Sequence, residues 1–236
     1  RDIDHPIFQV IDQQSRDVGA EVRYENTGKV GGRSNRFTFG FQPAWLNMDN
    51  RQYVNNGGQH GDLTKDQKDR ALGLGFYAED VFGVTERLSL VAGLRFDHQV
   101  RESEDFFLSN GDQSDERTYN PLSPKVGFLY SLPGGGQLFG NISRAYEPPL
   151  LLELNSQTVP GFIDLQGQSS WQFELGTRGR HNDFTWDVSV YDIELTNEIL
   201  NVNVQPFPGA PFTVPTYRNA PRTRHYGLEV GGTYMI

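Results

Sequence analysis

The sequence predicts an all-β protein, and more specifically an antiparallel up-and-down transmembrane β-barrel segment of about ten strands. Three observations lead to this fold class. Apolar and polar residues alternate with a period of two along most of the chain. Short and long connections between the expected strands alternate along its last two-thirds. The mean hydropathy is low, at −0.57, which suits strands that show lipid only at every second residue.

Composition excludes several other classes. The 236 residues include 30 acidic and 21 Lys or Arg side chains, so the formal net charge is −9, and a phosphate-binding surface is disfavoured. The chain has no Cys, which removes disulfide scaffolds, Cys nucleophiles and Cys-ligated zinc. No apolar run is long enough for a transmembrane helix or a secretory signal. Because the first residue is Arg and not Met, we expect the chain to begin inside a longer protein or after processing.

The clearest alternation follows residue 88. One face would carry Leu88, Leu90, Ala92, Leu94 and Phe96, and the other Ser89, Val91, Gly93, Arg95, Asp97 and Gln99. Equally clear strands begin near residues 18, 72, 171, 184 and 226, and weaker ones are expected at Ile3–Ile11, Phe37–Leu46, Leu122–Ser131 and Gln137–Tyr146. Read with a helical period, these segments scatter charges around the axis, so almost no helix is expected.

The connections alternate in length. Short turns rich in Gly, Pro, Asn and Asp are expected at Gly83–Glu86, Leu132–Gln137 and Gly179–Asp183. Long polar connections are expected at Asn47–Asp69, Arg101–Tyr119, Glu147–Ser170 and Asn197–Arg218. Successive connections of an up-and-down sheet lie at opposite ends, so this order predicts short periplasmic turns and long extracellular loops.

The polar strand faces would then line a wet lumen. Their charged members are Glu21, Arg23, Arg95, Asp97, Lys125, Glu174, Arg178, Asp187 and Glu229. A half-solvated sheet packed on a second sheet would give the same pattern. The pattern alone therefore leaves a barrel wall and a soluble β-sheet module both open.

Four stretches resemble successive strands of the C-terminal barrel of TonB-dependent outer-membrane receptors of the siderophore-receptor type. They are GFYAEDVFGVTERLSLVAGLRFDHQ (Gly75–Gln99), SPKVGFLYSLPGGGQLFGNISRAYEPPLLLEL (Ser123–Leu154), FELGTRGRHNDFTWDVSVYDIELTNEI (Phe173–Ile199) and NAPRTRHYGLEVGG (Asn219–Gly232). They occur in the family's order and cover roughly Ala71–Ile236.

The resemblance implies a partial domain. Whole receptors of this family have a plug domain, a TonB box and about 22 strands. We expect residues 1–236 to be a partial β-barrel domain with no plug domain and no TonB box. The final residues, Tyr234-Met235-Ile236, lack the family's usual terminal aromatic, so the C-terminal strands are expected to be missing.

The resemblance also implies a function. The whole protein would lie in the outer membrane of a Gram-negative bacterium and import a scarce ligand, most often a ferric siderophore. Its partners would be outer-membrane lipid, the siderophore or a similar small ligand, and the TonB complex through the plug, with no nucleic acid. It would be a receptor and not an enzyme. No cofactor is expected, since ferric iron would enter only as part of the bound siderophore.

Siderophore complexes are often anionic with planar groups, which Arg side chains and aromatic faces suit. Candidate ligand-binding residues at strand ends and in loops are Arg144, Tyr146, Phe162, Phe207, Phe212, Tyr217, Arg218 and Tyr53. The structural alternative for each aromatic residue is packing within its own loop, and for each Arg it is solvation or ion pairing. No metal site is expected, because the five His show no i, i+4 pairing. The acidic group Asp112, Asp115 and Glu116 matches no EF-hand spacing.

Two other functions compete. In a soluble or surface β-sheet module that recognises sugar or protein, Leu90, Phe96, Phe184 and Trp186 would contact another sheet. In an omptin-like outer-membrane protease, Asp and His near the rim would be catalytic. Asp97 and His98 are adjacent, however, and adjacent strand residues point to opposite faces. The protease is therefore the third choice.

Overall fold

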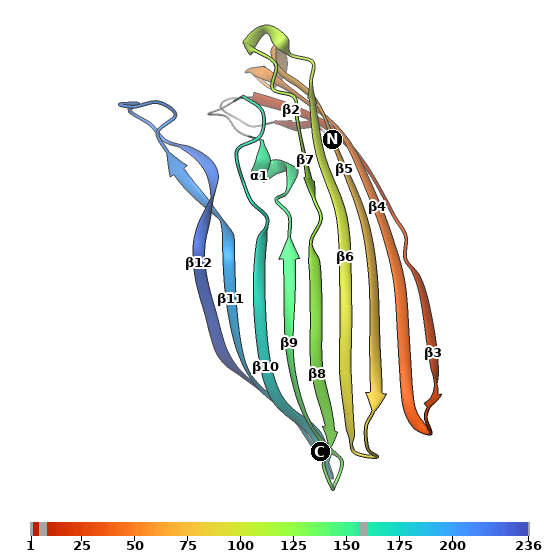
Figure 1. Ribbon diagram of the computed structural model, residues 1–236. Coiled ribbons are helices and arrows are strands. Elements are labelled where there is room, and N and C mark those ends of the chain that lie inside the picture. Colours follow the sequence, from red (N-terminus) through yellow and green to blue (C-terminus); the bar gives the residue numbers. More distant parts are fainter. Residues whose placement is uncertain (1, 5–8, 156–159, 236) are drawn as a thin grey trace.

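The protein forms one antiparallel sheet that curves like part of a barrel wall (Figure 1). The computed structural model describes residues 2–4, 9–155 and 160–235. The strands are β1 (Asp2–Asp4), β2 (Gln9–Gly19), β3 (Val22–Val30), β4 (Arg33–Asn56), β5 (Gln59–Gly83), β6 (Leu88–Asp105), β7 (Asp115–Tyr119), β8 (Leu122–Ser131), β9 (Gly136–Glu147), β10 (Gln168–His181), β11 (Phe184–Val204) and β12 (Val214–Tyr234). Two short helical elements are the 3₁₀ turn η1 (Leu108–Asn110) and the helix α1 (Leu151–Leu154).

The twelve strands occupy ten positions in the sheet. β2 and β3 both pair with β4, and β7 and β8 both pair with β6, so each couple is one long strand with a break. At the first break the Ala20 N–H still donates to Pro43 O at 3.0 Å. Along the path every strand pairs with its neighbour in sequence, and the path ends at β1 and β12. The predicted up-and-down order of about ten strands is confirmed.

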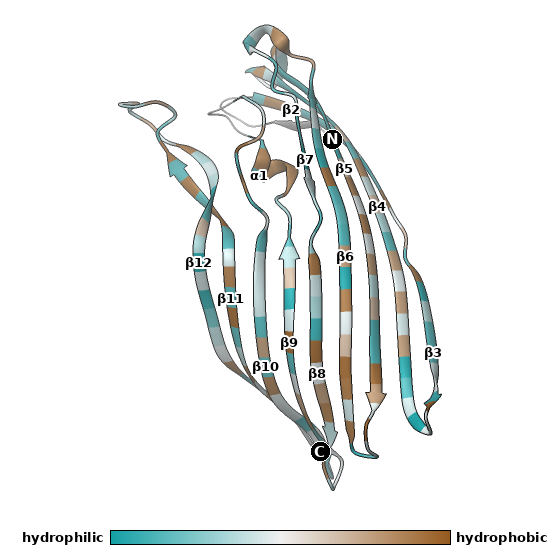
Figure 2. Ribbon diagram, viewed as in Figure 1, coloured by the Kyte–Doolittle hydropathy of each residue, from teal (hydrophilic) through white to brown (hydrophobic). Residues whose placement is uncertain are grey.

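The register separates the two faces as the alternation predicts. One row of mutually paired positions on the outer face reads Phe82, Leu90, Phe128, Gly140, Leu175, Val190 and Leu228. Many large apolar side chains on this face are exposed, for example Leu94 at 48% and Leu228 at 64%. Figure 2 shows hydrophobic and hydrophilic residues alternating along strands such as β6 and β8. An apolar face without a protein cover is typical of a lipid-facing wall and not of a sandwich.

The concave face is polar and cross-linked. Lys125 on β8 and Glu79 on β5 form a 3.1 Å ion pair across Gly93 of β6. Arg95 donates to Asp97 and to Gln42 Oε1 at 2.7 Å each. These contacts join four strands, β4, β5, β6 and β8, and they involve Arg95, Asp97 and Lys125, which were predicted to line the lumen. The Asp97 and His98 side chains diverge as expected, since His98 instead contacts Asn120.

The two ends of the sheet differ. One end has tight turns, including the Gly31–Gly32 turn between β3 and β4, where φ is +58° and +79°, as a two-residue type I′ hairpin requires. At the other end the prediction of four long polar connections is wrong in its boundaries. β4 and β5 continue to Asn56 and Gln59, and β11 and β12 continue to Val204 and Val214.

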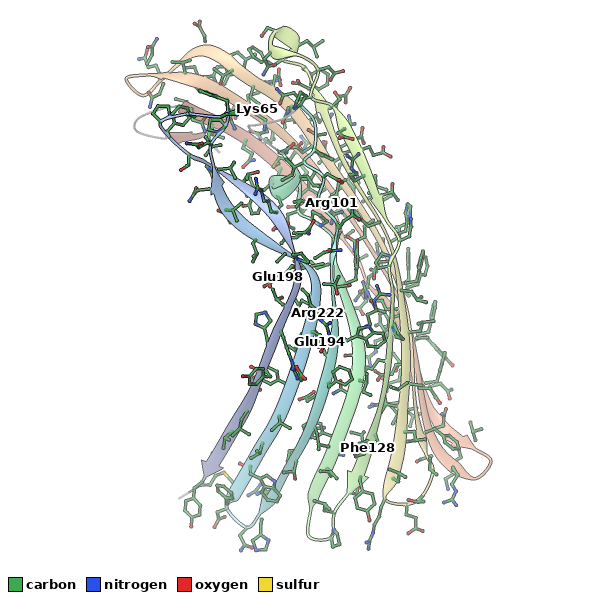
Figure 3. The ribbon with its side chains drawn as sticks, turned by 60° about the vertical axis from the view of Figure 1, so that its left-hand side comes forward. Lys65, Arg101, Phe128, Glu194, Glu198 and Arg222 are labelled. Atoms are coloured by element: carbon green, nitrogen blue, oxygen red, sulfur yellow. The ribbon has the colours of Figure 1, made fainter. Side chains whose placement is uncertain are left out.

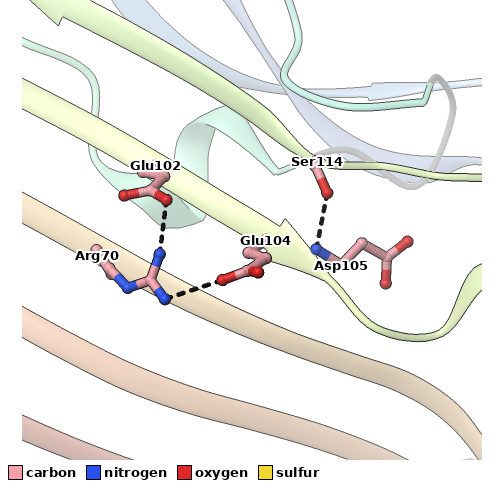
Figure 4. A network of polar contacts seen from close by, with 5 residues as sticks. All are labelled: Arg70, Glu102, Glu104, Asp105 and Ser114. Atoms are coloured by element: carbon pink, nitrogen blue, oxygen red, sulfur yellow. Dashed lines mark hydrogen bonds and ion pairs between the residues drawn. The ribbon is translucent and has the colours of Figure 1, made fainter.

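These extensions carry polar residues on both faces, so they lose the alternation that identifies a strand in the sequence while keeping the backbone pairing. Figure 4 shows one such region, where Arg70 of β5 bridges Glu102 and Glu104 of β6 at 2.6 and 2.9 Å. Among the described residues, the connection after β9 keeps the most residues outside the strands, at 148–155 and 160–167. The predicted strand Ile3–Ile11 is divided between β1 and β2, with residues 5–8 outside the described part.

The main apolar core lies at the loop end, on the concave side. Its buried members are Leu151, Leu154, Phe162 and Leu165. α1 contacts both β6 and β12, which are five positions apart in the sheet, so the helix must lie inside the curve. In the part of the chain that the structure describes, no helix is both long and apolar enough to span a bilayer.

Candidate ligand-binding site

The loop after β9 folds inward over the concave face. Leu154 is fully buried and Phe162 is 5% exposed, and this cluster packs on Leu46 of β4, Ala71 of β5, Ile199 of β11 and Tyr217 of β12. The loop therefore bridges strands from both sides of the curve and narrows the lumen at the loop end. Its buried apolar residues serve packing, whereas Leu150 and Leu152 stay exposed.

Polar contacts fix the loop to the strands beneath it. The Phe162 N–H donates to Asp115 Oδ2 at 3.2 Å. Asn219 of β12 makes two bonds with the Gln166 backbone, at 2.8 and 2.9 Å. Arg101 of β6 donates to Pro149 O at 3.3 Å, and burial lowers the pKa of its guanidinium. The loop is thus held at three strands.

A cavity of about 630 Å³ opens on the concave face beside this loop. Strands β9, β10, β11 and β12 supply its lining, which comprises Ala145, Tyr146, Glu147, Gln168, Ser169, Ser170, Gln172, Ile193, Leu195, Glu198 and His225. Glu147 accepts a 2.6 Å bond from Gln168, and Glu198 lies 3.7 Å from His225. The cavity thus combines hydrogen-bonding amides and hydroxyls with two carboxylates, and it can hold a polar ligand of small net charge.

Two tyrosines adjoin this side of the site. The Tyr119 and Tyr146 rings lie 6.5 Å apart at 46°. Burial raises the pKa of both phenols, that of Tyr119 to about 12. Both are therefore neutral hydrogen-bonding groups at physiological pH.

A slightly larger hollow of about 690 Å³ lies around Gly140 and is lined mostly by outer-face residues such as Leu90, Phe128 and Phe173. The Phe128 ring lies over Gly140, in the place that a Cβ at this position would take. This hollow belongs to the apolar band and suits hydrocarbon better than a polar ligand.

The structure distributes the eight predicted ligand-binding residues over several places. Tyr146 lines the concave cavity. Arg144 pairs with the 46% exposed Trp171 and so lies on the outer face. Phe162 is inside the loop core and Tyr217 packs against it. Arg218 is exposed on the strand face opposite to Tyr217.

The remaining three form aromatic pairs outside the cavity. Phe207 and Phe212, 57% and 55% exposed, meet edge to face at 6.4 Å in the loop between β11 and β12. Tyr53 stacks on His60 at 4.1 Å in the β4–β5 hairpin. The eight residues therefore do not form one site.

Sequence reasoning missed most of the cavity lining. Ser170, Gln172 and His225 lie within strands, whereas the predicted ligand-binding residues were at strand ends and in loops. The alternation of strand residues could have identified them. Trp171 and Phe173 lie on the outer face, so Ser170 and Gln172, which alternate with them, point inward. Figure 3 shows Glu198 and Arg222 on the last strands, near the bend where the site lies.

The comparisons with known proteins agree with this architecture. The family model described as TonB dependent receptor-like, beta-barrel matches residues 4–235. Among solved structures, the chain is similar to the copper transporter OprC, with 17% identity, a TM-score of 0.76, and coverage of 98% of this chain and 37% of that one. It is also similar to the siderophore receptor PiuA from Acinetobacter baumannii, with 14% identity, a TM-score of 0.74, and coverage of 96% and 37%.

A third similar structure is the ferric-catecholate import receptor Fiu from E. coli K12, with 17% identity, a TM-score of 0.70, and coverage of 96% of this chain and 36% of that one. The chain thus spans about a third of the length of the structures it matches, and at these identities they share its fold. The match of the family model over almost the whole chain carries the assignment. The chain belongs to the TonB-dependent receptor β-barrel family.

Proposed function

We propose that this chain is part of an outer-membrane receptor that binds a ferric siderophore at the loop end of its concave face and imports it with energy from the TonB complex. Proteins of this family are transporters, so the chain is not an enzyme. The cavity beside the inward loop carries the proposal, because it faces the lumen, presents amide, hydroxyl and carboxylate groups beside apolar ones, and is built from paired strands. The names of PiuA and Fiu support an iron chelate as the ligand class.

The apolar outer face supports an outer-membrane location with lipid as a partner. Leu90, Phe96 and Phe184, which a soluble module would bury, are 49%, 40% and 45% exposed. On β12 the outer face is apolar or small from Tyr226 to Tyr234, and a tilted membrane strand needs about 9–11 residues to cross the hydrocarbon. The partner would be a Gram-negative outer membrane.

The lining favours a particular kind of chelate. Glu147 and Glu198 give the cavity negative charge, while Arg144 and Arg218 lie away from it. Repulsion would weaken the binding of a strongly anionic complex such as ferric citrate. Amide and hydroxyl groups from Gln168, Gln172 and Ser170 suit the carbonyl and N–O groups of a hydroxamate. We therefore propose that hydroxamate complexes of low charge bind better than citrate.

The test uses the whole receptor in detergent and calorimetric titration with a ferric hydroxamate, a ferric catecholate, ferric citrate and Cu²⁺. We expect the hydroxamate to bind most tightly, and Tyr146→Ala to weaken it at least tenfold. The matched control is Tyr24→Ala, which removes a 57% exposed tyrosine near the turn end. Binding of Cu²⁺ and of no iron chelate would refute the siderophore assignment. An unchanged affinity in Tyr146→Ala would exclude this cavity as the binding site.

A further inference from the structure

Four adjacent polar side chains on the concave face of β4, β5 and β6 carry buried oxygen atoms that have no hydrogen-bond partner among the described residues. Asp69 is 0% exposed, Ser103 1%, Gln67 4% and Asn50 8%. Both Asp69 carboxylate oxygens, Ser103 Oγ, Gln67 Oε1 and Asn50 Oδ1 have no partner among the residues that the structure describes. Buried polar atoms are normally satisfied, so such a group calls for an explanation.

The register brings these atoms together. Asn50 is directly opposite Gln67, and Asp69 is directly opposite Ser103. Gln67 and Asp69 are two residues apart on β5, so their side chains point to the same face. Directly opposite residues have Cβ atoms about 4.5–5.5 Å apart. The four side chains therefore lie on one face of three neighbouring strands, with Asp69 and Gln67 between Ser103 and Asn50.

Neighbouring charged groups do not satisfy this patch. Asp105 is also buried, but its carboxylate already accepts the Phe107 and Gln113 N–H groups at 3.0 and 3.1 Å. Asp115, opposite Ser103, is engaged by Arg117 and by the loop at Phe162. Lys65 of β5 interacts electrostatically with Asp69 of its own strand and with Asp105 of β6. Among the described residues, however, no ion pair within 4.0 Å joins Lys65 to either carboxylate.

We propose that Asp69, together with Asn50, Gln67 and Ser103, binds a calcium ion at the loop end of the concave face. Ca²⁺ takes six to eight oxygen ligands from carboxylates, amide carbonyls and waters. One carboxylate, two amide oxygens and a hydroxyl supply up to five, and water can complete the shell. Mg²⁺ fits less well because it requires a small, near-ideal octahedron. Copper, zinc and nickel prefer imidazole or thiolate, and these four residues supply neither.

Neither the His spacing nor the acidic group Asp112, Asp115 and Glu116 points to this site. The acids of that group have other roles in the structure: Asp112 accepts the Ser114 N–H at 2.9 Å and Asp115 holds Arg117. A site with the single carboxylate of Asp69 and the nearby Lys65 ammonium should bind Ca²⁺ weakly. Its expected Kd is about 10⁻⁴–10⁻³ M, as in extracellular calcium modules.

Hydrogen exchange of the whole receptor, with and without 10 mM CaCl₂, tests the proposal on peptides from the loop ends of β5 and β6. At a Kd of about 1 mM, exchange by local opening should slow about tenfold in the wild type. MgCl₂ at equal ionic strength should have little effect. Asp69→Asn should abolish the calcium response, while Asp62→Asn, an exposed acid on the same strand, should keep it. Lys65→Met should enlarge the response by removing a competing positive charge.

Asp69→Asn removes a buried charge, so in the absence of calcium its exchange should be equal to or slower than that of the wild type. If this variant does not fold, Ser103→Ala replaces it and should weaken the response at least threefold. A wild type that is insensitive to calcium overturns the proposal. So does an Asp69→Asn or Ser103→Ala variant that responds like the wild type. Because no chelate is added, failure here leaves the siderophore proposal unaffected.

Discussion

Truncating Leu154 to alanine should release the inward loop without unfolding the barrel wall. Leu154 is 0% exposed and packs with Leu151, Phe162 and Leu165. Leu→Ala substitutions at fully buried sites cost about 2.7–5 kcal/mol. Because this cluster stabilises the loop against the strands, and the strands keep their own backbone pairing, the cost should fall on local opening of the loop.

At about 3 kcal/mol, loop opening becomes about 100-fold more frequent, since each 1.4 kcal/mol is a factor of ten. The reporters are the amides of Asn155, which donates to Leu151 O at 3.0 Å, and Ile163, which donates to Leu154 O at 2.9 Å. Their exchange, followed by mass spectrometry on the whole receptor, should accelerate by that factor. Amides in the middle of β5 and β6 should keep their wild-type protection.

Leu152→Ala is the matched control, because Leu152 lies in the same helix and is 72% exposed. Its effect should be within about 0.5 kcal/mol. If both substitutions accelerate exchange equally, the helix is not docked as described. If Leu154→Ala leaves Asn155 and Ile163 protected, the loop is not held by its apolar cluster and the reasoning fails.

Three further predictions concern the wall. Leu228→Arg on the outer face should cost about 2–4 kcal/mol in urea unfolding from lipid vesicles, whereas Glu229→Arg on the inner face should cost far less. Tyr119→Phe should stabilise the receptor by about 1 kcal/mol at pH 8, because its buried hydroxyl has no partner among the described residues. The wild type should lose stability between pH 10 and about 12, as Tyr119 with its raised pKa ionises and burial penalises the phenolate, whereas Tyr119→Phe should lose less. Arg70→Met should cost at most about 1 kcal/mol, an effect that 1 M NaCl removes, since both of its ion pairs are partly exposed.

The sequence predicts the wall well because one physical signal specifies it. Where one face of a strand meets hydrocarbon and the other meets water, apolar and polar residues must alternate. A one-residue slip in register would turn every apolar side chain to water and every polar one to hydrocarbon. Leu90, Val126 and Phe173 follow from that rule alone. The signal disappears at the loop end, where β4 and β5 leave the apolar band and both faces are polar, so their strand extensions looked like loops.

The candidate site could be predicted only in part, because its shape depends on tertiary packing. Nothing local in the sequence distinguishes Phe162, which the loop buries, from Phe207, which it leaves 57% exposed. Arg144 and Tyr146 are two residues apart, yet the Arg side chain lies on the outer face and the Tyr reaches the cavity where β9 ends. Residue type alone does not tell which of the two side chains reaches the cavity.

The division between strands and loops also bears on how such a receptor could discriminate ligands. The cavity lining comes mostly from paired strands, which hold side chains more precisely than loops do. The exposed Phe207–Phe212 pair is carried by a loop, where apolar rings offer area without directional bonds. Initial capture by such rings would be tolerant of ligand type, and selection would follow at Tyr146, Gln172 and their neighbours. In the proposed receptor the inward loop would lie beside that second step, and its docking through Leu154 would set the shape against which the ligand is selected.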